Sequence, residues 1–505
     1  MVEQREIRSL DPKQPWANFA GGASASVFSP VALAVVLVAG ILLLLLPRKK
    51  AIFPFLLAGL LIPGDQIVVL GSVHFPMLRI LLLFGLARIF WAKLSGQEEI
   101  FSGGLTGLDK CVVLLGVLIV VDGTLLYQDL GELIYQIGQL YSGLGTFILL
   151  RFLIRDEEDV KRTIRALACV TIVVAGFMTY EALTGRNLIY AALGGEHAWY
   201  LQESVQRDNR IRAAGVFAHA ILAGTFGGFM LPLFVGLWAK EKKGRLYMAA
   251  GIVGAIIMAI TASSSTALMG GLGGICGLCF WPLRRRMRAV RWGIVGLIVA
   301  DELRFKSHFW HIITDVDLTG GSSSWHRYML VDQCIRHFWS WALIGTKDYG
   351  SWGLDSFDLS DQYVGTADTS GLIPLILFVA ILVLGFKYLG RMRHIAETKQ
   401  DGKQEFFIWA IGASLFANVI AFFGISYFDQ IIVAWYALLA MISTVTLPGR
   451  SAEPAVEAVF AAKPGYGLSP ALASKPAFHR ERSESSQREN EVFPNRTAGI
   501  QKRLR

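Results

Sequence analysis

The chain has 505 residues, of which 53% are hydrophobic and only 17% are charged, against roughly 25% charged residues in a typical soluble protein. Its mean hydropathy is +0.48. These values exclude a soluble globular protein. A net charge of +9 would suggest a nucleic-acid partner in a soluble protein, but in a membrane protein the cationic residues collect in loops on one side of the bilayer. We therefore expect no nucleic-acid partner.

Apolar segments recur along the chain at the length needed to cross a bilayer, which takes about 20 residues of α-helix. A window of that length finds thirteen candidate spans, at residues 26–46, 51–70, 75–94, 107–122, 132–154, 164–183, 214–238, 246–262, 264–282, 287–301, 371–389, 406–425 and 428–447. The second and tenth are the weakest, because Pro63 and Gly64 interrupt the former and the latter has a short uncharged core. The sequence therefore predicts an all-α fold, a polytopic transmembrane helix bundle of 12 or 13 spans.

Basic residues follow every odd-numbered span up to the eleventh. Examples are Arg48-Lys49-Lys50 after the first span and Arg284-Arg285-Arg286 after the ninth, whereas the loops at 64–74 and 123–131 contain no Lys or Arg. Loops on the cytoplasmic side of a membrane are enriched in Lys and Arg. This alternation predicts an amino terminus outside the cytoplasm and places the even-numbered loops on the outer face.

Two of the predicted outer loops are long enough to hold a site. The first covers residues 185–213 and includes Arg210 and Arg212. The second covers residues 301–370 and holds ten acidic and five basic residues. Within it, residues 325–341 alternate polar and aromatic side chains at helical spacing, which predicts one or two helices along the membrane surface with Trp and Phe as anchors.

The predicted organisation has three parts. Residues 1–25 form an amino-terminal segment, residues 26–447 form the transmembrane domain with its large outer loop at 301–370, and residues 448–505 form a disordered cytoplasmic tail rich in Ser, Pro, Ala and mixed charge. The five cysteines give no disulfide framework, and the Cys276–Cys279 pair lies in an apolar helix without a second ligand pair. Nucleotide-binding, zinc-peptidase and nucleophile-elbow motifs are absent from the sequence. We therefore expect no metal and no cofactor.

Three segments in or beside the outer loops carry motifs in a recognisable order. They are residues 212–220 (RAAGVFAHA), residues 322–327 (SSSWHR) ahead of WALIG at 341–345, and residues 360–364 (SDQYV) followed by GLIPL at 371–375. They resemble the RxxGxFxxP, pLxG and HNxYL…GLxGL elements of the O-antigen ligase and polysaccharide polymerase superfamily. The turn at 180–187 (YEALTGRN) adds to the resemblance, which covers residues 75–447.

The resemblance implies a glycosyltransferase of the bacterial inner membrane, active on its periplasmic face, that takes glycan from a polyprenyl-diphosphate-linked oligosaccharide. It implies functional roles for Arg212 and Arg327, with Arg210 as their neighbour, and places Tyr363 in the substrate-binding motif. Ser360 stands where the ligases carry His, and Asp361 stands at the following Asn position. This departure looks more like the polymerase branch, so polymerisation of exopolysaccharide or O-antigen repeats is favoured over ligation to a lipid acceptor.

The chemistry of such a reaction requires cationic groups and a base. Guanidinium groups bind phosphate through paired hydrogen bonds, and fixed Arg side chains stabilise the charge that grows on a leaving diphosphate without a metal. Asp361 or His326 could accept the proton that the attacking hydroxyl loses. Arg79, near the outer end of the third span, is a weaker candidate for binding the lipid diphosphate.

Simpler roles remain open for these residues. Arg210 and Arg212 could lie at the membrane interface as snorkelling charges, Arg327 could cap a helix, and Asp361 could be one solvated acid among ten. For the whole protein, the alternatives are a ligase, a flippase or secondary transporter, and a non-catalytic component of an assembly complex. A transporter would normally show paired repeats and broken helices at the midplane. The expected partners are the lipid-linked oligosaccharide, membrane lipid and other polysaccharide assembly proteins.

Overall fold

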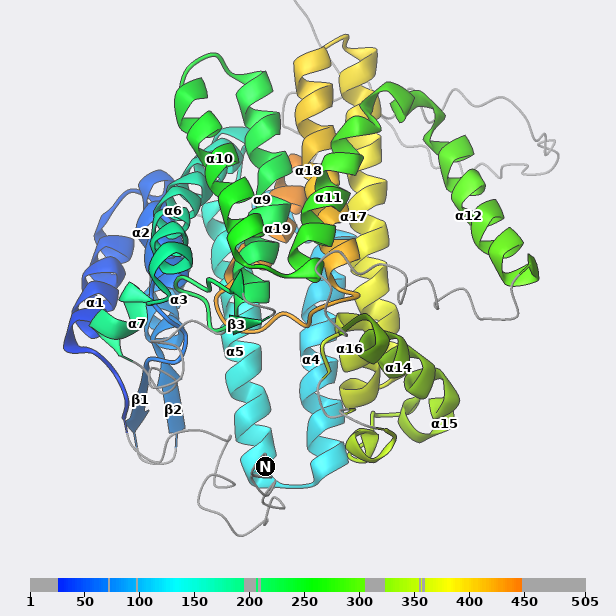
Figure 1. Cartoon of the computed structure of the whole chain (residues 1–505). Helices are drawn as coiled ribbons and strands as arrows, with labels where there is room; N and C mark the ends of the chain where they lie inside the picture. The colour runs from blue at the N-terminus through cyan, green and yellow to red at the C-terminus, as the bar shows by residue number, and fades with distance from the viewer. Residues whose placement is uncertain are drawn as a thin grey trace, which may run out of the picture. The chain divides into compact units, whose positions relative to one another are not determined.

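The structure is a computed structural model that describes residues 26–70, 73–96, 99–194, 206–207, 210–304, 323–353, 356 and 359–446. The chain divides into two units, Met1–Pro448 and Gly449–Arg505, and the described residues all belong to the first. The predictions for the amino-terminal segment and for the tail at 448–505 lie outside the described residues. The first unit contains the helices and strands drawn in Figure 1.

Each of the thirteen predicted spans contains an α-helix. The helices are α1 (Pro30–Leu45), α2 (Arg48–Leu61), α3 (Met77–Leu94), α4 (Gly107–Tyr127), α5 (Leu130–Leu153), α6 (Glu157–Thr184), α9 (Ala220–Lys240), α10 (Arg245–Thr261), α11 (Ser265–Cys279), α12 (Met287–Arg304), α17 (Leu372–Thr398), α18 (Gly402–Ala421) and α19 (Ile431–Val445). The all-α class and the polytopic helix bundle are therefore confirmed.

The number of membrane spans is a separate question. Among the described residues, six helices are long and apolar enough to cross a membrane by themselves, namely α4, α5, α6, α9, α17 and α18. A seventh span results if α11 is joined to residues 281–296, which are bent by 71° relative to it. The shorter apolar helices α1, α10 and α19 have 16, 17 and 15 residues, so length and composition alone support fewer spans than the 12 or 13 predicted.

The second predicted span is wrong in its second half. Helix α2 ends at Leu61, and residues Ile67–Leu70 form strand β1, which pairs antiparallel with β2 (Val73–Pro76). Pro63 and Gly64 end the helix, since proline cannot continue the hydrogen-bond ladder and glycine is a poor helix former. The β-branched residues that follow favour a strand. The hairpin lies at the end of the bundle where α3 begins (Figure 1).

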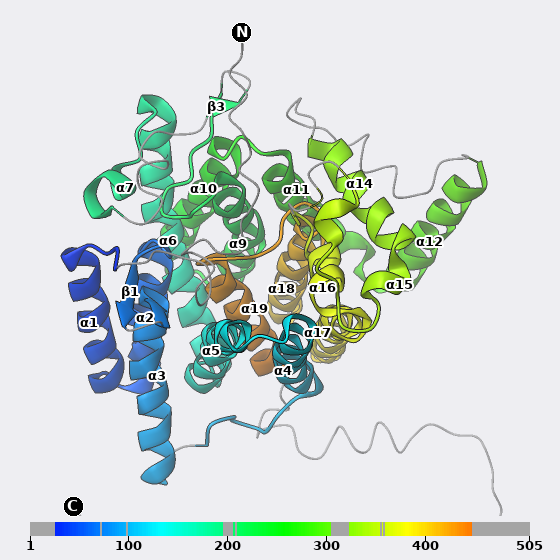
Figure 2. The same cartoon turned by 90° about the horizontal axis from the view of Figure 1, so that it is seen from below.

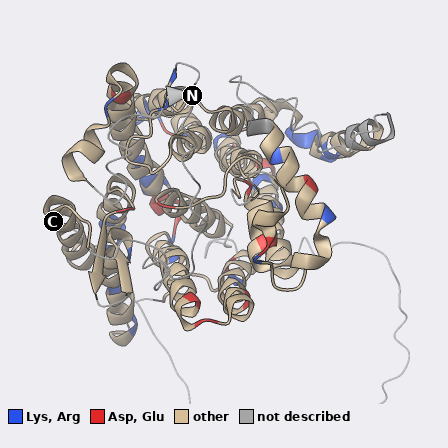
Figure 3. Ribbon diagram, turned by 60° about the horizontal axis from the view of Figure 1, so that its bottom comes forward, with Lys and Arg blue, Asp and Glu red and all other residues tan. Residues whose placement is uncertain are grey.

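Small residues bring the central helices into close contact. Helix α9 packs against α6, α10, α11 and α18 and lies among them when the bundle is seen from below (Figure 2). A Cβ atom on Gly228 of α9 would lie 2.8 Å from the backbone nitrogen of Gly271 in α11. Glycine at such contacts lets two backbones approach, as in many membrane helix pairs. The ribbon of the bundle carries few charged residues along the helices (Figure 3).

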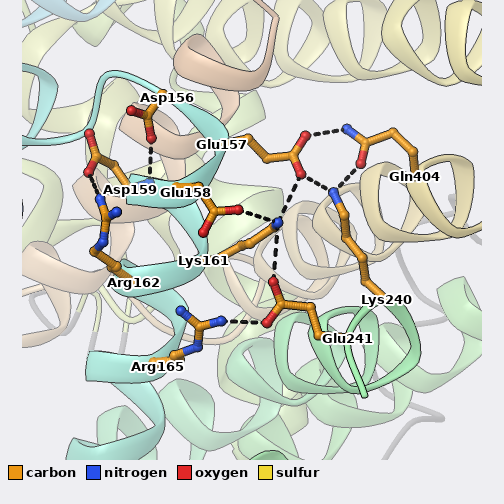
Figure 4. A network of polar contacts seen from close by, with 10 residues as sticks. All are labelled: Asp156, Glu157, Glu158, Asp159, Lys161, Arg162, Arg165, Lys240, Glu241 and Gln404. Carbon is orange, nitrogen blue, oxygen red and sulfur yellow. Dashed lines mark hydrogen bonds and ion pairs between the residues drawn. The ribbon is translucent and has the colours of Figure 1, made fainter. Parts of the chain in front are cut away.

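The basic loops meet at one end of the bundle. Figure 4 shows polar contacts at this end, where Lys161 binds the carboxylates of Glu157 and Glu241 and Lys240 binds that of Glu157. Contacts between different loops are Arg48–Asp159, Arg155–Glu99, Lys240–Gln404 and Arg284–Glu405. The loops that follow α1, α3, α5, α9, α11 and α17 therefore share one end, as the alternation of basic loops requires. We call it the basic end.

Short helices and strands occupy the opposite end. They are α7 (Leu188–Leu193), β3 (Gln206–Arg207), β4 (Arg210–Ile211), α14 (Ser323–Arg336), α15 (Phe338–Trp341), the 3-10 helix η4 (Tyr349–Ser351) and α16 (Gln362–Ser370). Trp325 and Trp339 are exposed on α14 and α15, consistent with the helices predicted along the membrane surface. All three motif-bearing segments lie at this end (Figure 1).

Candidate functional site

The loop that carries Arg212 is fixed by two buried side chains, Glu181 in the last turn of α6 and Asn187 just after that helix. The carboxylate of Glu181 accepts hydrogen bonds from the backbone nitrogens of Ala214 (3.1 Å) and Gly215 (2.8 Å) and from Nδ2 of Asn187 (3.1 Å). Asn187 also donates to the carbonyl oxygen of Gly215 (2.8 Å). Gly215 has φ +61°, which a residue with a side chain rarely adopts. The two segments noted in the sequence at 180–187 and 212–220 are thus one structural unit.

The opposite side of the same loop rests on the turn between α18 and α19. Nε2 of Gln430 donates to the carbonyl oxygen of Val216 (2.7 Å), and Oδ2 of Asp429 accepts from the nitrogen of Ala218 (3.3 Å). Burial raises the pKa of Asp429 to about 7, and the nearby Asp65 adds to the rise. The Arg212 loop is therefore held from both sides before any substrate arrives.

Arg212 itself is half-buried and lies close to His219, the N-cap residue of α9. Burial lowers the pKa of His219 to about 4, and the positive charge of Arg212 contributes to this. His219 is therefore neutral at physiological pH, and Nδ1 accepts a hydrogen bond from the nitrogen of Ile221 (3.2 Å). This histidine has a structural role at the start of α9.

Arg327 lies on α14 and reaches the beginning of α11. Its Nη2 donates to Oγ1 of Thr266 (2.6 Å), and the side chain is only 8% exposed. Ser264, the N-cap of α11, makes no side-chain capping bond. A helix amino terminus carries partial positive charge and favours anions, so a guanidinium beside it creates a strongly anion-attracting position.

The turn between α10 and α11 connects the two arginines. The nitrogen of Ala213, next to Arg212, donates to the carbonyl oxygen of Thr261 (3.1 Å) at the end of α10. Oγ of Ser263 donates to the carbonyl oxygen of Ile211 (3.2 Å), and Thr266 binds Arg327. The chain on both sides of Arg212 therefore contacts residues 261–263, and Arg327 contacts Thr266 at the start of α11. Arg210, on strand β4, is exposed and lies at the edge of this arrangement.

Asp361 is fully buried at the N-cap of α16, so the interpretation as a solvated loop acid is wrong. Its Oδ1 accepts from the nitrogens of Tyr363 (2.8 Å) and Val364 (3.0 Å). Burial raises the pKa of Asp361 to about 6, although the two backbone bonds and the charge of Arg327 oppose the rise. His326, half-buried on α14, lies 3.5 Å from Oγ of Ser360 through Nδ1. Arg327, His326 and Asp361 are therefore brought together.

Tyr363 and Arg79 have other surroundings. The hydroxyl of Tyr363 donates to the carbonyl oxygen of Val419 (3.1 Å), and its ring packs among the aromatic side chains of Phe378, Phe422 and Phe423. Arg79 donates to Oγ of Ser142 (3.0 Å) on α5 and to the carbonyl oxygen of His74 (2.8 Å) on β2. These contacts hold α3 against α5 and do not place Arg79 beside Arg212 or Arg327.

The sequence interpretation missed three residues of the site. They are Glu181, which fixes the Arg212 loop, Thr266, which binds Arg327, and Asp368. Asp368 lies seven residues after Asp361, which is two helical turns and the same face of α16. That spacing could have indicated a shared environment. The Glu181 contact joins residues 33 apart, and no local pattern reveals such a pairing.

The motif segments in the large loop also interlock. The nitrogen of Thr346 donates to the carbonyl oxygen of Asp368 (2.8 Å), and the nitrogen of Leu372 donates to the carbonyl oxygen of Ala342 (3.0 Å). A Cβ atom on Gly345 would lie 2.6 Å from the backbone of Thr369. The glycine of the WALIG segment is therefore required for the contact with the end of α16.

Comparison with known proteins adds no assignment to this geometry. No protein-family model matches the chain, and no curated protein shows significant similarity to it. The resemblance to O-antigen ligases and polysaccharide polymerases therefore rests on the sequence motifs alone.

Proposed function

We propose that this protein is a membrane glycosyltransferase that uses a polyprenyl-diphosphate-linked oligosaccharide and polymerises exopolysaccharide or O-antigen repeats. The observation that carries the proposal is that the Arg212 loop and Arg327 both contact residues 261–266, with Arg327 at the amino terminus of α11. Together they offer fork-shaped donors and backbone N–H groups to an anion. The diphosphate of a lipid-linked sugar donor is an anion of this kind.

The arrangement suits a reaction in which a diphosphate leaves. The acceptor hydroxyl forms a bond to the anomeric carbon while the bond from that carbon to the diphosphate oxygen breaks, and the electron pair leaves with the diphosphate. Arg212 and Arg327 stabilise the negative charge that develops there. Because Glu181 and Asp429 already fix the Arg212 loop, little reorganisation is needed at that moment. No metal is required in this proposal.

The acceptor hydroxyl must also lose a proton. His326 is half-buried on α14 and lies beside Ser360. Asp361 is buried at the N-cap of α16. We assign Asp361 the role of general base because its carboxylate is buried near Arg327 and Oδ2 accepts no hydrogen bond within the described residues.

The two ends of the bundle support the proposed orientation. The basic end carries the loops after α1, α3, α5, α9, α11 and α17, and membrane proteins keep such loops in the cytoplasm. The arginine site is at the opposite end. We therefore place the site on the periplasmic face of the bacterial inner membrane, where lipid-linked repeats are exposed to it together with membrane lipid and other polysaccharide assembly proteins.

Two alternative functions share parts of this description. A ligase would use the same lipid-linked sugar donor. Ser360 stands where the ligases carry His, and this difference disfavours the ligase function. A transporter would have a broken helix at the midplane of the membrane. The break after Cys279 instead lies at the basic end, next to Arg284, which binds Glu405 (2.9 Å). The polymerase function accounts for the site better than either alternative.

Deletion of the gene tests the proposal against both alternatives. We expect long surface polysaccharide to disappear while single repeats remain on the cell surface, because the chain-lengthening step is lost. Size separation of the polysaccharide and of the lipid-linked intermediates makes the measurement. Polymer retained on its lipid carrier would indicate a ligase instead, and repeats trapped in the cytoplasm would indicate a flippase.

A further inference from the structure

Helix α12 stands apart from the rest of the bundle in two views (Figures 1 and 2). It follows η2 (Trp281–Arg286), a short 3-10 helix, and residues 281–296 are bent by 71° relative to α11. Among the described elements, α12 packs closely only against η2. The side chains of this helix are therefore open to whatever surrounds the protein near the basic end.

The short helix η2 is held firmly to the bundle. Nε of Arg284 donates to Oε1 of Glu405 (2.9 Å), and Nε of Arg285 donates to Oε1 of Glu397 (2.7 Å). The ring of Trp281 packs edge-on against the ring of a phenylalanine in α18, with centroids 5.1 Å apart. The start of α12 therefore has a fixed position at the basic end.

Three arginines follow these anchors without a carboxylate partner. Arg286, Arg288 and Arg291 are exposed, and none of them forms an ion pair within the described part of the chain. Nε of Arg291 donates to the carbonyl oxygen of Met287 (3.2 Å), one turn earlier in the same helix. Arg288 and Arg291 are three residues apart and so share one face of α12. The first two turns of the helix thus present a concentrated positive charge that no described residue neutralises.

An uncharged apolar stretch follows the arginines, from Trp292 to Ala300. Trp292 is 70% exposed, Ile294 49% and Val295 47%. Successive residues of an α-helix are rotated by about 100°, so these three side chains point in different directions. A second copy of the chain would cover one face of α12, whereas lipid acyl chains cover every apolar side chain that no helix covers. Lipid therefore fits this helix better than a second copy does.

The charge beside this apolar helix selects the kind of lipid. Guanidinium groups bind phosphate through paired hydrogen bonds. Anionic phospholipids expose such phosphates at the membrane surface and attract clusters of basic residues that lie beside a membrane helix. Tryptophan is enriched at the same depth, the interface between membrane and water, and Trp292 directly follows Arg291. Groups that bind a phosphate headgroup are thus next to a helix that acyl chains cover.

We propose that η2 and the first two turns of α12 bind the headgroup of an anionic phospholipid through Arg286, Arg288 and Arg291. The lipid belongs to the leaflet at the basic end, which is the cytoplasmic leaflet in the proposed orientation. Its acyl chains lie along the apolar part of α12 and supply the contacts that a neighbouring helix would otherwise make. The site is at the opposite end of the bundle from Arg212 and Arg327, so this proposal does not depend on the glycosyltransferase function.

Lipid binding to the purified full-length protein in neutral detergent tests the proposal. Native mass spectrometry should show that phosphatidylglycerol binds more tightly than phosphatidylcholine with the same acyl chains, because only the former carries a net negative charge. The triple variant Arg286→Gln/Arg288→Gln/Arg291→Gln should weaken phosphatidylglycerol binding by about 10- to 100-fold, since each basic residue near an anionic surface contributes roughly fivefold. Equal affinity of the wild-type protein for the two lipids would overturn the proposal.

Two matched variants separate a built site from diffuse attraction. Lys242→Gln/Lys243→Gln/Lys403→Gln removes three other exposed charges at the basic end and should leave phosphatidylglycerol binding nearly unchanged, because salt screens charges outside the site. Replacing Arg286, Arg288 and Arg291 by Lys keeps every charge, and with it the signal for membrane orientation, but loses the paired donors. This variant should bind about 3- to 10-fold more weakly. An equal loss in the lysine control, or full affinity in the Arg→Lys variant, would contradict the proposal.

Hydrogen exchange in nanodiscs locates the bound lipid on the chain. Amides of residues 281–291 should exchange more slowly in phosphatidylglycerol than in phosphatidylcholine, since a bound headgroup suppresses local opening of this segment. Residues 241–244, which carry exposed lysines at the same end, should exchange alike in both lipids. Equal protection of the two segments, or none at residues 281–291, would overturn the proposal.

Discussion

Lysine at position 327 should reduce polymer formation by about 30- to 1000-fold, which corresponds to a loss of roughly 2–4 kcal/mol of transition-state stabilisation. Arg327 is buried, binds Oγ1 of Thr266 and lies at the amino terminus of α11. A lysine keeps the positive charge but replaces a planar fork of donors with a single point charge. Polymer length and yield in a deletion strain complemented with Arg327→Lys measure the effect, and Arg212→Lys should behave similarly.

A matched substitution on the same helix serves as the control. Arg336 also lies on α14, but its side chain is 67% exposed and binds Asp332. Arg336→Lys should leave polymer formation close to wild type, because exposed ion pairs contribute little and the residue is outside the site. Near-normal polymer from Arg327→Lys at wild-type protein level would mean that Arg327 does not bind the leaving group.

Asparagine at position 361 should lower polymer formation by about 100-fold or more, while the protein remains folded. Asp361 has two roles, as N-cap of α16 and as proposed base. Asparagine is as good an N-cap as aspartate, and its side-chain oxygen can accept the same bonds from Tyr363 and Val364. The substitution therefore removes the negative charge and the proton acceptor but retains the cap. Polymer sizing together with thermal unfolding of the purified variant makes the measurement.

Two further variants complete this comparison. Asp361→Ala removes the cap as well and should lower stability by about 1 kcal/mol relative to Asp361→Asn. Asp332→Asn should preserve polymer length, because the partner of Asp332 is Arg336, which is exposed and lies outside the site. Normal polysaccharide from Asp361→Asn would assign the base to His326. The acids Asp355 and Asp358, which the sequence also offers as controls, lie outside the described residues.

The sequence predicts the helices because composition and length dominate them. Each of the thirteen apolar segments holds a helix, and the alternation of basic loops correctly anticipates that these loops share one end. The prediction of a helix fails where helix-breaking residues interrupt an apolar segment. In the second span, Pro63 and Gly64 end the helix and the following β-branched residues pair with Val73–Pro76 instead.

The site is only partly readable from the sequence, since burial is a property of the tertiary structure. A loop containing ten acids gives no sign that Asp361 and Asp368 are buried while Asp348 is exposed. The seven-residue spacing of Asp361 and Asp368 becomes informative only once α16 is known to pack on α14. Likewise, the Glu181 clamp on Gly215 joins two motifs that the sequence shows merely as neighbours of the same loop.

The most direct measurement of the central claim is a reaction with purified, reconstituted protein and a polyprenyl-diphosphate-linked oligosaccharide repeat. The proposed function predicts that glycan of two or more repeats forms and that one polyprenyl diphosphate is released for each new linkage, with both products strongly reduced in Arg327→Lys. Full retention of the starting repeat by the folded wild-type protein, or glycan lengthening without release of polyprenyl diphosphate, would contradict the proposed function.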